Sequence, residues 1–339
     1  MNDENNGFTN DVGTKKKNIL LPIAIVVIIA IIVGAYFLIT KLGNKEEDNN
    51  KGNENVPVET EKVTPLMYEI TKEGSDNKIY LFGSIHFANI SKIEFPEYLL
   101  NAYTDSDYVA CEFDVIEFMK NVDQQKLAEE YIYTDGTTLE DQLSKETYDK
   151  VIKYLKDNFN YEEEMAKVFK ASYIESLITQ LILKDTGIST ISGIDTHFLN
   201  KAKADKKTIL EVESYELQTE AQNKISDKYY DLALAQVIDK YDEAVNDMKE
   251  LYAAWSSGDV NKLIEITEDN GDTEEEKALV DEYNKLLLFD RNIGMANKLK
   301  EYFNDNKKVF YMVGAAHLVG DKGIAKLIEN EGYIVKKVN

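Results

Sequence analysis

Two short motifs in this sequence place a histidine just after an apolar strand. Each consists of four apolar residues followed by G-x-x-H, with Gly83 and His86 in the first motif and Gly314 and His317 in the second. In an α/β sheet a glycine permits a tight turn after a buried strand, and the next polar side chain projects from the carboxyl edge, where such folds place their sites. Because the chain has only three histidines, we expect His86 and His317 to meet at one site.

Two other predicted strands end in carboxylates. Glu112 follows the apolar residues 108–111, and Glu211 lies near the end of the segment 208–212. Imidazoles and carboxylates that converge at a sheet edge are the ligands expected for zinc, manganese or iron, and a bound metal turns water into a nucleophile. The alternative is that the histidines cap local backbone and that the glutamates cap helices or pair with lysines.

Other side chains with chemical potential are less specific. Arg291 is the single arginine among lysines, and only arginine offers a planar fork for a carboxylate or an oxyanion, so it belongs either to the site or to a surface ion pair. His197 begins an amphipathic helix and could be a ligand or a structural histidine. Ser84 lies beside His86, but no G-x-S-x-G motif accompanies it, and Cys111 has the apolar neighbours of a core residue.

The hydrophobic pattern predicts the sheet that would position these side chains. Residues 66–71 and 78–83 flank a turn-forming segment, which indicates a hairpin. Further strands are expected at residues 108–113, 188–194, 208–212, 309–313 and 333–338. The segments 188–194 and 208–212 enclose a helical pattern at 196–204, as is typical of a β-α-β unit.

Two long helical blocks interrupt the strands. Residues 138–184 have apolar side chains at helical spacing and indicate an inserted lid or cap. Residues 215–304 form a second block, which is broken where Gly258 can end one helix and Asp259 can cap the next. The sequence therefore predicts an α/β domain with a mixed, mainly parallel sheet, flanked by helices and carrying helical insertions.

An apolar segment near the N-terminus predicts a membrane anchor. Residues 19–39 carry no charge, and as a helix they span roughly 31 Å, which matches the hydrocarbon core. Three lysines at 15–17 precede them, so the positive-inside rule places the N-terminus in the cytoplasm. A cleaved signal peptide is the alternative, but the apolar run is longer than such a peptide needs and no small-x-small cleavage site follows.

This topology divides the chain into four parts. We expect a cytoplasmic tail at 1–18, a single transmembrane helix at 19–40, a flexible linker at 41–62 and an extracytoplasmic domain at 63–339. The net charge is −23, and since the charges of the tail cancel, the acidity lies beyond the predicted anchor. Such a domain repels nucleic acid and anionic lipid, so no nucleic-acid partner is expected. The single cysteine excludes an intrachain disulfide.

Taken together, the motifs resemble those of the TraB/PrgY/GumN family, to which the Tiki membrane proteases are related. The resemblance covers the region after the linker and rests on residues 83–86, Glu112, 193–199, 210–211 with Gln218, 291–292 and 314–324. It implies an α/β fold akin to the erythromycin esterase and ChaN-like group, with both histidines and the strand-end glutamate at a shared site. Family members often carry Pro-Trp where this chain reads Lys-Ala-Ser-Tyr, at 170–173. This difference affects the substrate contacts that the resemblance implies for the cap, and not the predicted metal site.

The resemblance also implies a function. Tiki-type relatives are metal-dependent peptidases, and PrgY-like relatives are linked to shutdown of a secreted peptide pheromone. We therefore expect a membrane-anchored, metal-dependent hydrolase that acts on a secreted or surface peptide. The expected roles are metal ligation (Mn, Zn, Co or Fe) by His86, Glu112 and His317, metal binding or base catalysis by Glu211, and oxyanion stabilisation by Arg291 and Asn292. The alternatives are a non-catalytic receptor that sequesters a peptide or haem, and a tethered interaction domain.

Overall fold

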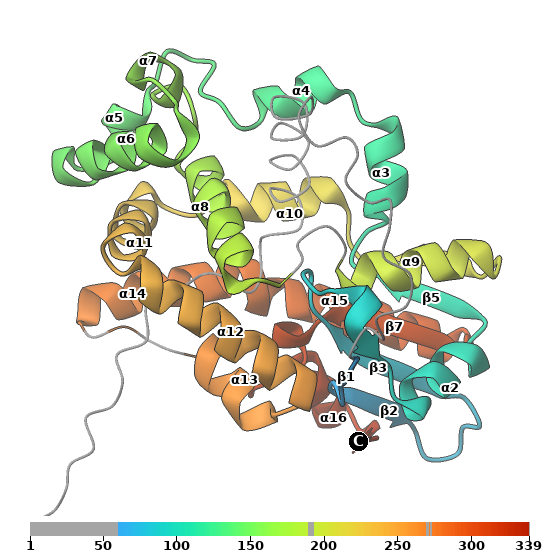
Figure 1. Cartoon of the computed structure of the whole chain (residues 1–339). Coiled ribbons are helices and arrows are strands. Elements are labelled where there is room, and N and C mark those ends of the chain that lie inside the picture. Colours follow the sequence, from blue (N-terminus) through green and yellow to red (C-terminus); the bar gives the residue numbers. More distant parts are fainter. Residues whose placement is uncertain (1–59, 189–192, 269–270, 272, 339) are drawn as a thin grey trace, which may run out of the picture.

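The computed structural model describes residues 60–188, 193–268, 271 and 273–338. Its main sheet has six strands in the order β6-β5-β7-β3-β2-β8 (Figure 1). Their bounds are β2 Met67–Thr71, β3 Ile79–Ser84, β5 Tyr108–Cys111, β6 Thr208–Glu211, β7 Val309–Gly314 and β8 Ile334–Lys337. Strands β6, β5, β7 and β3 are parallel, whereas β2 is antiparallel to β3 and β8. The predicted mixed, mainly parallel sheet is confirmed.

The central strands are β3 and β7, and every residue in them is buried. Such strands are covered on both faces, which explains why they appear in the sequence as continuous apolar runs. The predicted hairpin is formed by β2 and β3, in which Met67 lies opposite Phe82. A separate small sheet pairs β1 (Glu61–Lys62) with β4 (Ile93–Glu94).

The predicted strand at 188–194 is wrong at its C-terminal end. Helix α9 (Ile194–Ala204) begins at Ile194, with Gly193 as its N-cap, while residues 189–192 lie outside the described part of the chain. The Ile194 N–H donates to the carbonyl of Ile85 at 2.9 Å. Asp195 in the first turn also favours a helix start, because a carboxylate there interacts with the helix dipole. Among the described residues, the helix and the second strand of the predicted β-α-β unit are present as α9 and β6.

Both helical blocks are present, and each is divided into several helices. The elements between β4 and β6 are α2 Glu97–Asp105, which precedes β5, then α3 Val115–Asn121, α4 Gln124–Glu129, α5 Leu139–Gln142, α6 Lys145–Phe159, α7 Glu163–Ala166, α8 Ala171–Thr186 and α9. Those between β6 and β7 are α10 Tyr215–Gln222, α11 Asp227–Asp239, α12 Tyr241–Ser257, α13 Val260–Thr267, α14 Glu274–Asn284, the π-helical η2 Lys285–Phe289 and α15 Asp290–Asn304. Helix α16 (Ile324–Asn330) precedes β8. The predicted break is confirmed, since Gly258 ends α12 and Asp259 caps α13.

The insertions leave the sheet at the carboxyl ends of β5 and β6. Helix α8 contacts α11, and α11 also contacts α6 and α14. We call α6, α8, α11 and α14 the helical cap. Figure 1 shows α6, α8 and α11 apart from the strands, whereas α9 lies beside the sheet and contacts β5 and β6.

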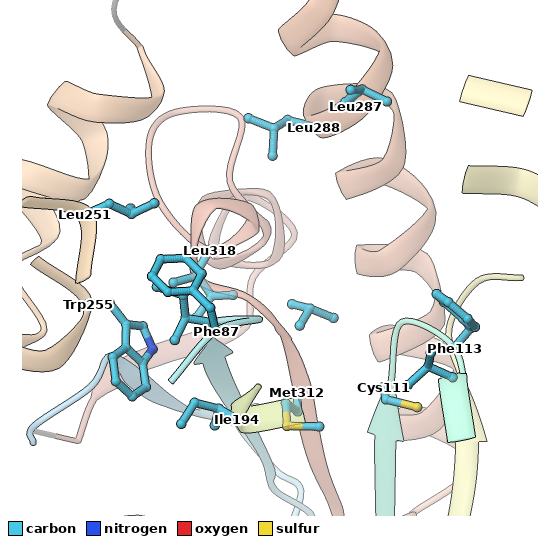
Figure 2. Close-up of a cluster of buried hydrophobic side chains, with 14 of the residues drawn as sticks. Phe87, Cys111, Phe113, Ile194, Leu251, Trp255, Leu287, Leu288, Met312 and Leu318 are labelled. Atoms are coloured by element: carbon cyan, nitrogen blue, oxygen red, sulfur yellow. The ribbon is translucent and has the colours of Figure 1, made fainter. Parts of the chain in front are cut away.

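Buried apolar side chains join the strand ends to the insertions. Figure 2 shows Phe87, Trp255 and Leu318 gathered near one another, and all three belong to the main hydrophobic core. The Trp255 indole N–H donates to the carbonyl of Gly83 at 3.0 Å. This bond fixes helix α12 to the end of β3. The bonded residue, Gly83, belongs to the same motif as His86.

The predicted membrane anchor and linker lie almost entirely outside the described residues. Within the part of the chain that the structure describes, no helix has the length and apolar character needed to cross a membrane. The predicted transmembrane helix at 19–40 stays a prediction.

Candidate functional site

The end of β7 is the point where the predicted residues meet. A Cβ atom placed on Gly314 would lie 3.5 Å from Glu112 Oε1, 3.5 Å from His317 Cδ2 and 3.6 Å from His86 Nε2. Because both ring atoms lie within 3.6 Å of one point, they are at most about 7 Å apart. The two motifs are offset by one residue in register, since Ser84 lies opposite Gly314. The structure thus brings together side chains that follow β3, β5 and β7.

His86 is held by an acidic partner from α9. Its Nδ1 lies 2.7 Å from Asp195 Oδ2, and the Ser84 hydroxyl donates to the other oxygen of the same carboxylate. Burial alone would lower the pKa of His86, but the charges of Asp195 and Glu112 outweigh burial, and the pKa is raised. With Nδ1 directed to Asp195, Nε2 faces the Gly314 region, and the histidine has the supported geometry typical of a metal ligand.

The backbone beside His86 leaves no room for a side chain. A Cβ atom on Gly193 would lie only 2.6 Å from the carbonyl oxygen of His86. Glycine at this position allows the start of α9 to approach the His86 loop closely. Asp195 reaches Nδ1 because of this approach.

His317 is held in the same manner by an amide. Its Nδ1 lies 2.6 Å from Asn292 Oδ1, and the Asn292 amide nitrogen donates to the carbonyl of Lys322 at 2.9 Å. This second bond fixes Asn292 Oδ1 as the acceptor, so Nδ1 of His317 carries the proton and Nε2 carries a lone pair. Burial and the Arg291 guanidinium lower the pKa of His317 to about 3. The ring is therefore neutral at physiological pH.

Glu112 is buried and accepts hydrogen bonds at both oxygens. Oε1 accepts from the Gly314 N–H at 2.9 Å, and Oε2 accepts from Arg291 at 2.8 Å and Gln218 at 3.0 Å. Burial alone would raise the pKa of Glu112, but the Arg291 guanidinium, His317, His86 and the hydrogen bond from Gly314 together outweigh burial and lower the pKa to about 2. His317 Nε2 lies 3.9 Å from Glu112 Oε1.

Arg291 bridges two carboxylates. Besides Glu112, its guanidinium donates to both oxygens of Glu213 at 2.7–3.1 Å. Only 4% of the side chain of each of these three residues is exposed. Burial and the negative charge of Glu112 raise the pKa of Glu213. The alternative of a surface ion pair for Arg291 is therefore wrong.

A π-helical turn positions Arg291. Element η2 lies directly before α15, and the Arg291 Nη1 donates to the carbonyl of Leu287 within it at 3.0 Å. A π-helical turn widens the backbone and is frequent at functional sites. Nε, Nη1 and Nη2 of Arg291 all have acceptors, so the guanidinium supports Glu112 and Glu213. Asn292 orients His317. The role of Arg291 and Asn292 at an oxyanion stays a prediction.

Glu211 is not brought to Gly314. Its carboxylate is exposed and accepts a hydrogen bond from the Asp114 N–H at 2.8 Å. The carboxylate that Arg291 binds is instead that of Glu213, two residues after Glu211. The expected role of Glu211 as ligand or base stays a prediction.

Sequence reasoning missed three functional residues of the site: Asp195, Glu213 and Gln218. The Gly-Ile-Asp and Gln218 positions formed part of the family resemblance, which was the available signal. Nothing in the local pattern separated Glu213 from Glu211.

His197 and Cys111 lie elsewhere. The His197 ring stacks on Phe95 with centroids 5.2 Å apart, and burial lowers its pKa. Cys111 is buried in the core, and burial raises the pKa of its thiol. The contacts of both side chains are therefore those of residues that stabilise the fold.

The donor chemistry at Gly314 can be compared with the needs of a metal ion. Among the described residues, no three His, Cys, Asp or Glu side chains already form a group that could hold a metal. The 3.9 Å between His317 Nε2 and Glu112 Oε1 is nevertheless less than the sum of two metal–ligand bonds, about 4.1 Å. Glu112 and Glu213 also share one guanidinium, which leaves one buried negative charge that favours a bound cation. The residues fit a metal, provided that Glu112 Oε1 turns from Gly314 toward it.

A comparison with known families gives one match. The model of the TraB/PrgY/gumN family matches residues 66–337. The chain belongs to this family. The match spans the whole main sheet, and it includes every residue of the candidate site. No curated protein and no solved structure matches the chain.

Proposed function

We propose that this TraB/PrgY/gumN family protein is a metal-dependent hydrolase that cleaves a peptide bond in a secreted or surface substrate. The observation that carries the proposal is the pair of imidazoles beside Glu112, each with its Nδ1 engaged by an oxygen acceptor. Such partners fix the tautomer of metal-binding histidines and direct Nε2 toward the ion.

In this proposal His86, His317 and Glu112 would hold the metal, which when bound lowers the pKa of a water molecule so that it attacks a carbonyl. The protein supplies the supporting contacts. Asp195 and Asn292 hold the Nδ1 protons of the two imidazoles, so both Nε2 atoms stay free. Arg291 keeps Glu112 ionised at physiological pH, and Glu213 balances the charge of Arg291. Phe87 and Leu318 lie in a cluster of buried apolar side chains (Figure 2).

The test is cleavage of a peptide library by the purified full-length chain. We expect turnover that a chelator abolishes and that Mn²⁺, Zn²⁺, Co²⁺ or Fe²⁺ restores. Replacing Glu112 by glutamine should reduce turnover by roughly 100-fold or more, because the amide cannot supply the anionic ligand. Glu117→Gln, an exposed change on α3, serves as the control and should leave turnover unchanged. Turnover that is insensitive to the chelator would contradict the proposed metal dependence. Peptide binding without cleavage would contradict the proposed hydrolase activity.

We also propose that residues 63–339 lie outside the cytoplasm, held by the predicted anchor at 19–40. The lysines at 15–17 and the uncharged run after them support this topology. Protease added to intact cells should therefore digest the domain while the chain stays in the membrane fraction. Complete protection of the domain in intact cells, with digestion after lysis as the control, would rule the topology out.

A further inference from the structure

Gln218 on helix α10 joins two carboxylates of the candidate site. Its amide nitrogen donates to Glu112 Oε2 at 3.0 Å and to Glu213 Oε2 at 3.2 Å. An ionised carboxylate such as that of Glu112 only accepts hydrogen bonds, so the nitrogen of the amide must face it. The two acceptors therefore fix the orientation of the amide, with its oxygen, Oε1, turned away from them.

The Oε1 atom of Gln218 has no donor among the described residues. The two bonds donated by the amide nitrogen are those that the Gln218 side chain makes within the described part of the chain. In the same part, the buried side-chain atoms without a partner belong to Tyr131, Glu175 and Tyr230. Gln218 Oε1 is not one of these atoms, and the residue is only partly buried. The oxygen is therefore open to solvent and can accept a hydrogen bond from a ligand.

Helix α10 is held in place around this amide. The Ser214 side chain caps the helix by accepting from the Leu217 N–H. The Tyr215 ring stacks on Phe118 of α3 with centroids 4.2 Å apart. A group that is already fixed loses little conformational entropy when a ligand binds. Gln218 therefore presents its oxygen in one preorganised position.

The accessible oxygen lies close to the predicted metal ligands. The two polar atoms of an amide or a carboxylate are about 2.2 Å apart, so the hydrogen bond between Gln218 and Glu112 places Gln218 Oε1 at most about 7.5 Å from Glu112 Oε1. Consecutive Cα atoms of a peptide are about 3.8 Å apart. A peptide whose carbonyl is held beside Glu112 would therefore bring an amide one or two residues away within reach of Gln218.

We propose that Gln218 Oε1 accepts a hydrogen bond from a backbone N–H of the peptide substrate, close to the bond that is cleaved. The inference rests on the proposed peptidase function. A backbone N–H fits this acceptor because every residue of a peptide except proline carries one, whereas peptide carbonyls are acceptors themselves. Gln218 is then a substrate-binding residue that sets the register of the peptide against Glu112 without contacting the side chains of the peptide.

The experiment is an ester scan of one peptide against the full-length chain. The peptide is the library member that the chain cleaves fastest, or binds most tightly where none is cleaved. Each backbone amide other than the cleaved one is replaced in turn by an ester, which removes the N–H and keeps the shape of the peptide. The value of kcat/KM is measured for the metal-loaded chain, and the dissociation constant is measured by fluorescence anisotropy for the chelator-treated chain. We expect one ester position to lower kcat/KM or affinity about fivefold or more, because it lacks the donor to Gln218.

Variants assign this effect to Gln218. In Gln218→Met the amide and ester peptides should behave alike at that position. In Gln125→Met, a matched change at an exposed position on α4, the wild-type difference should persist. A change that acted only through Glu112 would slow all peptides alike and would leave the ester effect in place. Gln218→Met should also retain about one metal ion per chain, because Glu112 keeps its bonds to Arg291 and Gly314.

The possible results separate the contact from the hydrolase activity. An undiminished ester effect in Gln218→Met, or no sensitive amide in the wild-type chain, would overturn the contact. Loss of the metal from Gln218→Met would also overturn it, because the side chain would then support the metal centre. The expected ester effect on affinity in a chain without turnover would contradict the hydrolase alone. Absence of both peptide binding and turnover would contradict both.

Discussion

Replacing Arg291 by methionine is expected to lower the free energy of unfolding by roughly 3–5 kcal/mol. Removal of one partner from a buried ion pair leaves an uncompensated charge, which costs about this much. Here the change leaves two carboxylates, Glu112 and Glu213, without their shared cation. Lysine at this position would keep the charge but could not reach both carboxylates and the Leu287 carbonyl together. Denaturant unfolding of the full-length chain measures the effect.

A matched control lies on the same helix. Lys298 and Glu301 form an exposed ion pair on α15, so Lys298→Met should cost less than about 1 kcal/mol. Adding Glu213→Gln to Arg291→Met should recover part of the lost stability, because one unpaired charge is removed. A loss below about 1 kcal/mol for Arg291→Met would contradict the buried bridge.

Replacing Gly314 by alanine is expected to lower metal affinity and turnover by about 100-fold with little change in stability. The residue has φ −53° and ψ 138°, which alanine adopts readily. The added methyl would lie 3.5–3.6 Å from Glu112, His317 and His86, which is ordinary van der Waals contact. It would therefore occupy the space among these side chains without forcing them apart.

Gly294 provides the comparison for this change. A Cβ atom there would meet nothing within 4 Å, so Gly294→Ala in α15 should raise stability by about 0.5–1 kcal/mol and leave turnover unaltered. Thermal unfolding and peptide cleavage of both variants provide the measurements. Full activity in Gly314→Ala would show that no ligand needs the space beside Gly314.

The strands could be predicted because burial on both faces produces apolar runs. Strands β3 and β7 contain such runs, and in both motifs a glycine directly follows the apolar run. The expectation that the two histidines meet followed from the shared carboxyl edge of parallel strands, whereas the adjacency of β3 and β7 is shown only by the folded chain. The predicted strand extended too far, to Ile194, because a short apolar stretch does not reveal that Gly193 caps a helix.

The roles around Arg291 could not be predicted from local sequence. Glu211 and Glu213 are two residues apart, and the end of β6 at Glu211 decides which carboxylate turns toward α15. The burial of Arg291 depends on η2, and the hydrophobic pattern gives no sign of a π-helical turn. The pairing of Asn292 with His317 depends on the approach of α15 to the end of β7, which only the folded chain shows.

The most direct test of the proposed metal centre is the metal content of the purified full-length chain, measured by mass spectrometry after loading and dialysis. We expect about one first-row divalent ion per wild-type chain, and its loss from His86→Ala and from His317→Ala. Both variants should keep the wild-type circular dichroism spectrum, which shows that the fold persists. Retention of one ion per chain by the double variant, or no specific ion in the wild type, would contradict a metal site formed by these histidines.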